Sequence, residues 1–259
     1  MSINIDSLMN SISEMAQIAE RCVDFFDNVQ RWINNNKSKI ENTVQAVTDF
    51  AIWSNTLREM ENKQIIFTDH LSLKIAKDFL ASNNIEEAVW KYYTENSPSR
   101  LDELIERCRK SNVLTAGMSL FEQAVSSFHV GYYQLACTGL FALMDGILAD
   151  ASGIIYNQSY KKRFDAIEEK LNNRLTFSDM ELKLFCVLSG INTIKDTIFG
   201  NSDFTKPEPK GIINRHWVLH GRTTREYNKI DVLKLFLTLD AIIFLSEICD
   251  KPIIEEKEA

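Results

Sequence analysis

The sequence predicts an all-α protein. Only four prolines and nine glycines occur in 259 residues, which is few for a sandwich or barrel built from many tight turns. Apolar residues between Ile5 and Trp32 recur at steps of three and four, the period of one helical face. A hydrophobic content of 45% can supply a full core. We expect a helical N-terminal region over residues 1–110 and a helical bundle over residues 111–259.

The N-terminal region is expected to hold a helical hairpin followed by connecting helices. A polar break at residues 34–39 ends the first helix, and the apolar period resumes at Ile40. Thr68 or Asp69 is a suitable N-cap for a further helix. Nothing in the sequence of this region indicates its role, and its apolar stripe suits burial in its own domain or packing on a partner helix.

The C-terminal bundle begins with a central pair of helices. Residues 113–149 are apolar on most faces, with one break near residues 129–131. Three further helices are expected: residues 160–172, a helix introduced by a capping box at Ser178 and Glu181, and a helix that runs from the N-cap Asn228 to Asp250.

No feature of the sequence indicates a membrane or secreted protein. Residues 232–249 are apolar but include Lys234, Asp240 and Glu247, which are costly in hydrocarbon, so we predict a buried amphipathic helix. The N-terminus lacks a basic segment followed by an apolar run. The five cysteines are widely spaced without a C-x-x-C pair, which favours reduced, buried thiols. We expect a cytoplasmic protein with no membrane partner.

The charge distribution leaves room for one small nucleic-acid contact. A net charge of -7 opposes a broad surface that neutralises phosphates. Between Lys206 and Glu226, however, five basic residues stand against two acidic ones.

That basic segment contains the stretch NRHWVLHGRT, residues 214–223. In a helix from Ile212 to His220, His216 and His220 share a face, as two metal ligands would. The zinc motif H-E-x-x-H needs a glutamate where Trp217 stands, so we favour no metal and no cofactor; a metal site would have to recruit Asp145, His129 or a cysteine. Arg215 and His220 are five residues apart, roughly 140° around the helix axis, and do not share a face.

Arg215, the polar His216, three further residues and His220 resemble the R-polar-x3-H signature of the HEPN superfamily (higher eukaryotes and prokaryotes nucleotide-binding domains). The long apolar helix KIDVLKLFLTLDAII after the motif and the upstream segment HVGYYQLACTGLFALMDGILAD are similar to those of bacterial HEPN-like proteins. The resemblance covers about residues 111–250. It implies a metal-independent endoribonuclease, often homodimeric, in phage defence or in a toxin-antitoxin or CRISPR-associated system.

The chemistry of the two signature residues is consistent with that implication. RNA carries its own nucleophile, the 2′-hydroxyl, so cleavage needs proton transfer and stabilisation of charge on the phosphate. Histidine titrates near neutral pH, which suits His220 as general acid or base. The guanidinium of Arg215 suits the phosphate oxygens. One such histidine per chain predicts a homodimer through the last helices of the bundle, which would supply the second.

Five further residues are candidates for supporting roles. His216, Asn214 and Asp145 are expected to support catalysis, and Arg222 and Lys210 to bind substrate. Three of them have plainer interpretations. Asn214 and Arg222 suit capping or solvation, and Asp145 suits a backbone partner or solvent as well as it suits orienting Arg215 or a histidine.

Two other functions remain open. One is a non-catalytic HEPN-like module that binds nucleotide or RNA or scaffolds a protein partner. The other is an unrelated helical bundle in which Arg215, His216 and His220 are surface groups. For a catalytic and a non-catalytic HEPN-like protein alike, an antitoxin or a regulatory protein is a candidate partner of residues 1–110.

Overall fold

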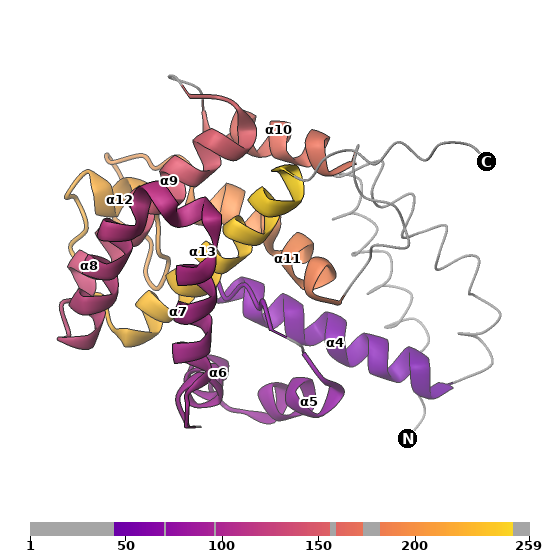
Figure 1. Ribbon diagram of the computed structural model, residues 1–259. Coiled ribbons are helices and arrows are strands. Elements are labelled where there is room, and N and C mark those ends of the chain that lie inside the picture. The colour runs from indigo at the N-terminus through magenta and orange to yellow at the C-terminus, as the bar shows by residue number, and fades with distance from the viewer. Residues whose placement is uncertain (1–43, 70, 96, 156–158, 173–181, 251–259) are drawn as a thin grey trace, which may run out of the picture.

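The computed structural model describes residues 44–69, 71–95, 97–155, 159–172 and 182–250 (Figure 1). All regular elements within these residues are helical, which confirms the predicted all-α class; the HEPN-like arrangement of the bundle remains a prediction. The elements are α4 (Val44–Asn62), α5 (Leu73–Ala81), α6 (Ile85–Thr94), α7 (Arg100–Lys110), η1 (Asn112–Gly117), α8 (Met118–His129), α9 (Tyr133–Ser152), α10 (Tyr160–Asn172), α11 (Leu182–Thr193), the π-helical turn η3 (Ile194–Ile198), α12 (Arg215–Leu219) and α13 (Lys229–Asp250).

α13 is the central element of the fold. It runs through the middle of the molecule in Figure 1, and α6, α7, α9 and α10 pack against it from different sides. Almost every side chain from Asp231 to Cys249 is buried. The expected burial of this segment is therefore confirmed, but its expected amphipathic character is wrong, because α13 has no continuous polar face.

Charged residues inside α13 are accommodated by ion pairs. The ammonium group of Lys234, 3% exposed, contacts the carboxylate of Glu86 on α6. The carboxylate of Asp240 accepts hydrogen bonds from Nε and Nη2 of Arg107 at 2.9 and 3.0 Å, and Nη2 of Arg107 also contacts Asp69 at 2.9 Å. A buried charge without a partner is costly, so these pairs fix α6 and α7 against α13.

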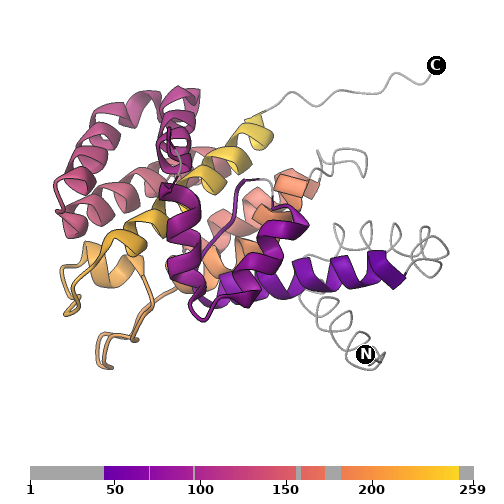
Figure 2. The ribbon, with the colours of Figure 1, turned by 90° about the horizontal axis from the view of Figure 1, so that it is seen from below.

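The helices before residue 110 share one hydrophobic core with those after it. α4 packs on α5 and α11, while α7 packs on α13. Figure 2 shows the N-terminal half of α4 extending past the other coloured helices. The division into regions at residue 110 remains a prediction.

Local sequence signals placed several elements correctly. The pair α8 and α9, with its break at residues 130–132, the helix α10 and the start of α13 all match their expected positions, and the side chain of Asn228 accepts hydrogen bonds from Ile230 and Asp231 as an N-cap. The expected helix over residues 5–32 and the capping box at Ser178 and Glu181 lie outside the described residues.

The expected N-cap at Thr68 or Asp69 is wrong. The next helix, α5, begins after Ser72, whose hydroxyl accepts a hydrogen bond from the backbone N–H of Ile75. Thr68 is buried, and the Asp69 carboxylate is held by Arg107, so neither side chain caps a helix.

α9 is long and apolar enough to cross a membrane, the one such helix among the residues that the structure describes. Of its apolar window, 61% is buried inside the fold, where it packs against α8, α10, α12 and α13. A core helix passes the same test of length and composition, so this is weak evidence for a membrane. Cys108, Cys137, Cys186 and Cys249 are all buried, as expected.

Candidate active site

The stretch that carries the signature forms a short helix, which the side chain of Asn214 caps at its N-terminus. α12 covers only Arg215–Leu219, shorter than the expected helix from Ile212 to His220. The side-chain oxygen of Asn214 accepts hydrogen bonds from the backbone N–H of His216 at 2.9 Å and from the hydroxyl of Ser202 at 2.8 Å. Its amide nitrogen donates to the carbonyl oxygens of Thr197 and Gly200. Asn214 is 6% exposed, so it caps α12 and fixes the chain before it rather than facing a substrate.

Gln64 explains why the helix does not begin earlier. Its side-chain oxygen accepts a hydrogen bond from the backbone N–H of Ile213 at 2.6 Å, and its nitrogen donates to the Ile213 carbonyl at 2.8 Å. The same nitrogen contacts the hydroxyl of Thr197 at 3.0 Å. Gln64 is 1% exposed and has a φ of 56°, a conformation that is uncommon for residues other than glycine. A residue after α4 therefore positions the backbone directly before the signature.

The end of α12 matches its expected position. Gly221 adopts a φ of 61°, and the backbone N–H of Arg222 returns to the carbonyl oxygen of Trp217 at 2.9 Å. A glycine in this left-handed conformation terminates helices at little cost. His220 is consequently the C-cap residue of α12, and its side chain is exposed.

Arg215 is held by an ion pair with Asp145 of α9. Nη2 of Arg215 lies 3.1 Å from one carboxylate oxygen, and Nη1 of Arg163 lies 2.7 Å from the other. The hydroxyl of Tyr160 donates to the carboxylate, and the guanidinium carbon of Arg215 lies 4.5 Å from the centroid of the Tyr160 ring. Of the interpretations of Asp145 that the sequence left open, the structure supports the one in which it orients Arg215.

This cluster holds more positive than negative charge. Burial raises the pKa of Asp145, but the hydrogen bond from Tyr160 and the charge of Arg215 outweigh it, so the pKa of Asp145 lies below its usual value. Burial and the neighbouring carboxylate raise the pKa of Tyr160, which keeps its hydroxyl protonated as a donor. One carboxylate faces two guanidinium groups, whose Nε atoms are buried without hydrogen-bond partners among the described residues.

The two histidines lie on another side of α12, against Phe204. The rings of His216 and His220 are 5.4 Å apart between centroids, and the Phe204 ring is 6.0 Å from His216 and 5.6 Å from His220. Burial and the charge of Arg215 lower the pKa of His216, which favours its neutral form. The backbone N–H of Ser202 points to its Nδ1 at 3.4 Å, which places the proton of the neutral ring on Nε2.

Arg215 and His220 thus face different surroundings. Arg215 contacts Asp145 and Tyr160, His220 contacts His216 and Phe204, and no contact among the described residues joins Arg215 to His220. This separation agrees with the angle calculated from their spacing.

Three of the five basic side chains in the segment from Lys206 to Glu226 form ion pairs in the structure. Arg215, Arg225 and Lys206 are paired with Asp145, Asp231 and Asp203. Lys210 and Arg222 are exposed, and the guanidinium carbon of Arg222 lies 4.9 Å from the Phe204 ring centroid. Lys210 lies on the loop before α12, whereas Arg222 lies beside the histidines, and both side chains are open to solvent.

No group of three or more His, Cys, Asp or Glu side chains is arranged to hold a metal ion within the residues that the structure describes. His129, which a metal site would have recruited, is exposed on α8 and contacts the ring of Phe128.

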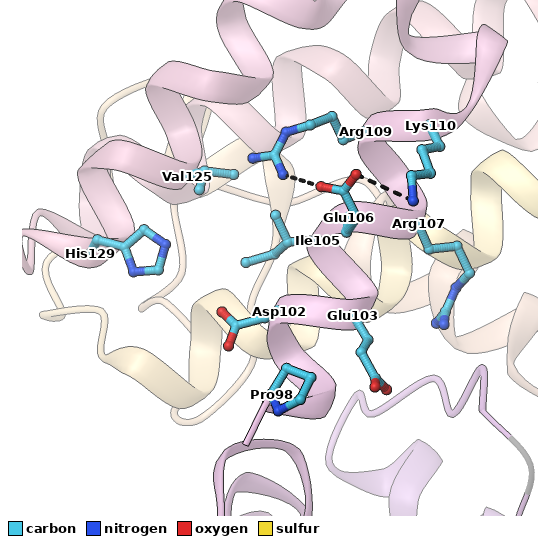
Figure 3. Close-up of a pocket in the computed structure, with 10 residues that line it drawn as sticks. All are labelled: Pro98, Asp102, Glu103, Ile105, Glu106, Arg107, Arg109, Lys110, Val125 and His129. Atoms are coloured by element: carbon cyan, nitrogen blue, oxygen red, sulfur yellow. Dashed lines mark hydrogen bonds and ion pairs between the residues drawn. The ribbon is translucent and has the colours of Figure 1, made fainter. Parts of the chain in front are cut away.

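A separate groove lies between α7 and α8. Its volume is about 740 Å³, and Figure 3 shows His129 and Val125 on one wall and the charged residues of α7 on the other. Glu106 pairs with Arg109 and Lys110 across the surface of α7. None of the predicted site residues lines this groove.

Four residues of the site were missed in the sequence: Gln64, Tyr160, Arg163 and Phe204. Phe204 offered a signal, because it is the one aromatic residue in the polar loop GNSDFTKPEPKG. The other three lie far from the signature in sequence, and no local pattern connects them to it.

Comparisons of the chain with protein-family models, curated proteins and solved structures gave no match.

Proposed function

We propose that this protein is a metal-independent endoribonuclease of the HEPN type. The observation that carries the proposal is the arrangement of α12, whose exposed C-cap residue His220 lies beside His216 while Asp145 fixes Arg215, the first residue of the helix. A general base has to reach a substrate proton, and His220 is accessible for that role.

In the proposed reaction the 2′-oxygen of RNA attacks the adjacent phosphorus while His220 accepts the proton of the 2′-hydroxyl. The bond from phosphorus to the 5′-oxygen breaks, and the leaving oxygen takes a proton from a second histidine. The products carry a 2′,3′-cyclic phosphate and a 5′-hydroxyl. Arg215 stabilises the charge that develops on the phosphate.

The second histidine and the separation of Arg215 from His220 both favour a homodimer, which we include in the proposal. Most side chains of α13 are buried within its own chain, which leaves this last helix little exposed surface for the expected contact. Exposed apolar residues of α8, α9 and the turn between them could contribute to the dimer contact, namely Leu120, Val130, Tyr132 and Leu135. Sedimentation at several concentrations tests this, and a monomer that cleaves RNA would contradict it.

The test of the activity is incubation of purified protein with mixed RNA, with and without EDTA. We expect cleavage in both conditions, products with 5′-hydroxyl and cyclic phosphate ends, and its loss in Arg215→Ala and His220→Ala. His129→Ala, an exposed histidine outside the site, is the matched control and should cleave as wild type does. Intact RNA with wild type, or cleavage abolished by EDTA, would contradict the proposal.

One observation favours the alternative of a non-catalytic HEPN-like module. The Arg215 side chain is only 15% exposed and is already paired with Asp145, which limits its reach to a phosphate. A non-catalytic module would bind RNA or nucleotide, or interact with a protein partner, without cleaving RNA. A cytoplasmic location and a role in phage defence or a toxin-antitoxin system belong to the proposal as well.

A further inference from the structure

Phe204 is the centre of an aromatic cluster at the surface. Its ring centroid lies 5.0 Å from that of Trp217, 5.6 Å from His220 and 6.0 Å from His216. The guanidinium carbon of Arg222 lies over the ring, 4.9 Å from its centroid. Phe204 is half-buried, whereas Arg222 and His220 are exposed. The cluster therefore presents flat side chains to solvent directly beside the proposed general base.

Arg222 differs from the neighbouring arginines in its partners. Arg215 and Arg225 each hold a carboxylate at 3.1 and 2.6 Å. The contacts described for Arg222 include the Phe204 ring and no carboxylate. An arginine held by a ring rather than by an acid keeps its charge and its planar face available to a ligand.

The two segments that carry Phe204 and Arg222 are fixed to each other. The carboxylate of Glu208 accepts hydrogen bonds from the hydroxyl of Thr223 at 2.8 Å and from the backbone N–H of Thr224 at 2.9 Å. Nearer Phe204, the Asp203 carboxylate accepts a hydrogen bond from the Thr205 hydroxyl at 2.6 Å. A surface that is already ordered loses little conformational freedom when it binds.

We propose that Phe204 and Arg222 form a stacking platform for a base of single-stranded RNA, next to His220. Every base has a flat face that stacks on aromatic rings and on guanidinium planes, so such a platform binds RNA with little sequence preference. In this arrangement the base of the nucleotide next to the scissile phosphate stacks on the face of the Arg222 guanidinium that lies opposite the Phe204 ring. This inference rests on the proposed function, and it assigns Arg222 to a base rather than to a phosphate.

The test is a binding measurement that does not depend on cleavage. A fluorescent single-stranded oligonucleotide with 2′-O-methyl groups lacks the nucleophile, and an oligomer of the same backbone with abasic sites lacks the bases. Fluorescence anisotropy at several salt concentrations gives the affinity and its salt dependence for both. The variant Arg222→Lys keeps the positive charge without the planar group, and Phe204→Leu keeps an apolar side chain without the ring. Arg100→Lys is the matched control, because Arg100 lies over the ring of Tyr92 on α6, away from α12.

We expect wild type to bind the oligomer with bases about tenfold or more tightly than the abasic oligomer. Arg222→Lys and Phe204→Leu should remove most of that difference, whereas Arg222→Lys should leave the salt dependence unchanged because its charge is kept. Arg100→Lys should bind as wild type does. Arg222 is exposed, so its variant keeps the test valid even if Phe204→Leu unfolds the loop.

Equal affinity for the two oligomers, or a wild-type affinity in Arg222→Lys, would overturn the platform. Displacement of the oligomer by an equal concentration of adenosine monophosphate would overturn its assignment to an RNA chain. Base-dependent binding without cleavage of ordinary RNA would support the platform while rejecting the endoribonuclease, so the two failures are distinguishable.

Discussion

Replacing Asp145 with asparagine tests the ion-pair cluster that holds Arg215. The change keeps the size of the side chain and its ability to accept the hydrogen bond from Tyr160. It removes the negative charge that faces Arg215 and Arg163, so two largely buried guanidinium groups are left without a counter-ion.

The exposures of the three side chains set the size of the effect. They are 31% for Asp145, 10% for Arg163 and 15% for Arg215. Breaking a fully buried pair costs about 3–5 kcal/mol and an exposed pair about 0–1 kcal/mol. For this intermediate exposure we expect a loss of about 2 kcal/mol in the free energy of unfolding. In a chain of this size that corresponds to a melting temperature lower by about 4–8 °C.

The assay is urea unfolding of wild type, Asp145→Asn, Arg163→Gln and the double variant. The loss of stability in the double variant should be smaller than the sum of the losses in the two single variants, by about 1 kcal/mol or more. The reason is that Arg215 then no longer faces the positive charge of Arg163. Asp150→Asn, an exposed aspartate on the same helix, is the control and should change stability little.

The pH dependence gives a second check on the same pair. The pKa of Asp145 is lowered in the folded protein, so its contribution is present above the unfolded value of 3.8 and is lost as the pH falls through the folded value. The difference between wild type and Asp145→Asn should therefore shrink in acid. Unchanged stability of Asp145→Asn at pH 7, or strict additivity with Arg163→Gln, would refute the reasoning.

Three further predictions concern polar side chains that are buried fully or in part. Burial raises the pKa of Glu61 to about 7, whereas the unfolded chain releases this proton near 4.5. The stability of the protein should therefore fall by up to about 3 kcal/mol as the pH rises from 4.5 to about 7. Urea unfolding at pH 5 and pH 8 should show this loss in wild type but not in Glu61→Gln. An equal change in the free energy of unfolding between the two pH values in both proteins would contradict the prediction. Gln64→Ala leaves the buried backbone groups of Ile213 without partners and should lower the free energy of unfolding by about 2–3 kcal/mol, whereas the control Gln123→Ala, at an exposed residue of α8, should change it little. A similar loss in both variants would contradict the role of Gln64 in holding Ile213. Asn214→Ala removes the cap of α12 and three further hydrogen bonds, so a thermal melt should show a loss of stability of about 2 kcal/mol, and an unchanged melting temperature would reject the capping role.

Much of the helical layout could be predicted because its signals are local. The break between α8 and α9 and the cap at Asn228 follow from residues within one or two turns of the chain. The start of α5 could not be predicted in this way, since Thr68, Asp69 and Ser72 are comparable capping residues. The contact of Asp69 with Arg107, 38 residues away in sequence, is what removes it from that role.

The polar residues of α13 led to the wrong prediction of an amphipathic helix for a similar reason. Lys234 and Asp240 in an apolar segment indicate a solvated face when only the sequence is considered. Their partners, Glu86 and Arg107, come from two earlier helices, so only the folded chain distinguishes a buried ion pair from an exposed one.

The candidate site shows the same boundary between local and distant information. The angle between Arg215 and His220 follows from helix geometry, and the different contacts of the two side chains agree with it. Gln64 could not be recognised, because its role depends on two hydrogen bonds between its side chain and the backbone of Ile213, 149 residues further along the chain.

The burial of α13 also has a consequence for how the protein is made. α6, α7, α9 and α10 all pack against α13, yet the ribosome synthesises residues 44–228 before it. Until α13 emerges, the apolar surfaces that it later covers have no partner within the chain. Completion of the core must therefore follow synthesis of nearly all described residues, and contacts over such long sequence separations form slowly. During this interval the apolar faces that α13 will cover are exposed, and exposed apolar surface of this kind is what chaperones protect from aggregation.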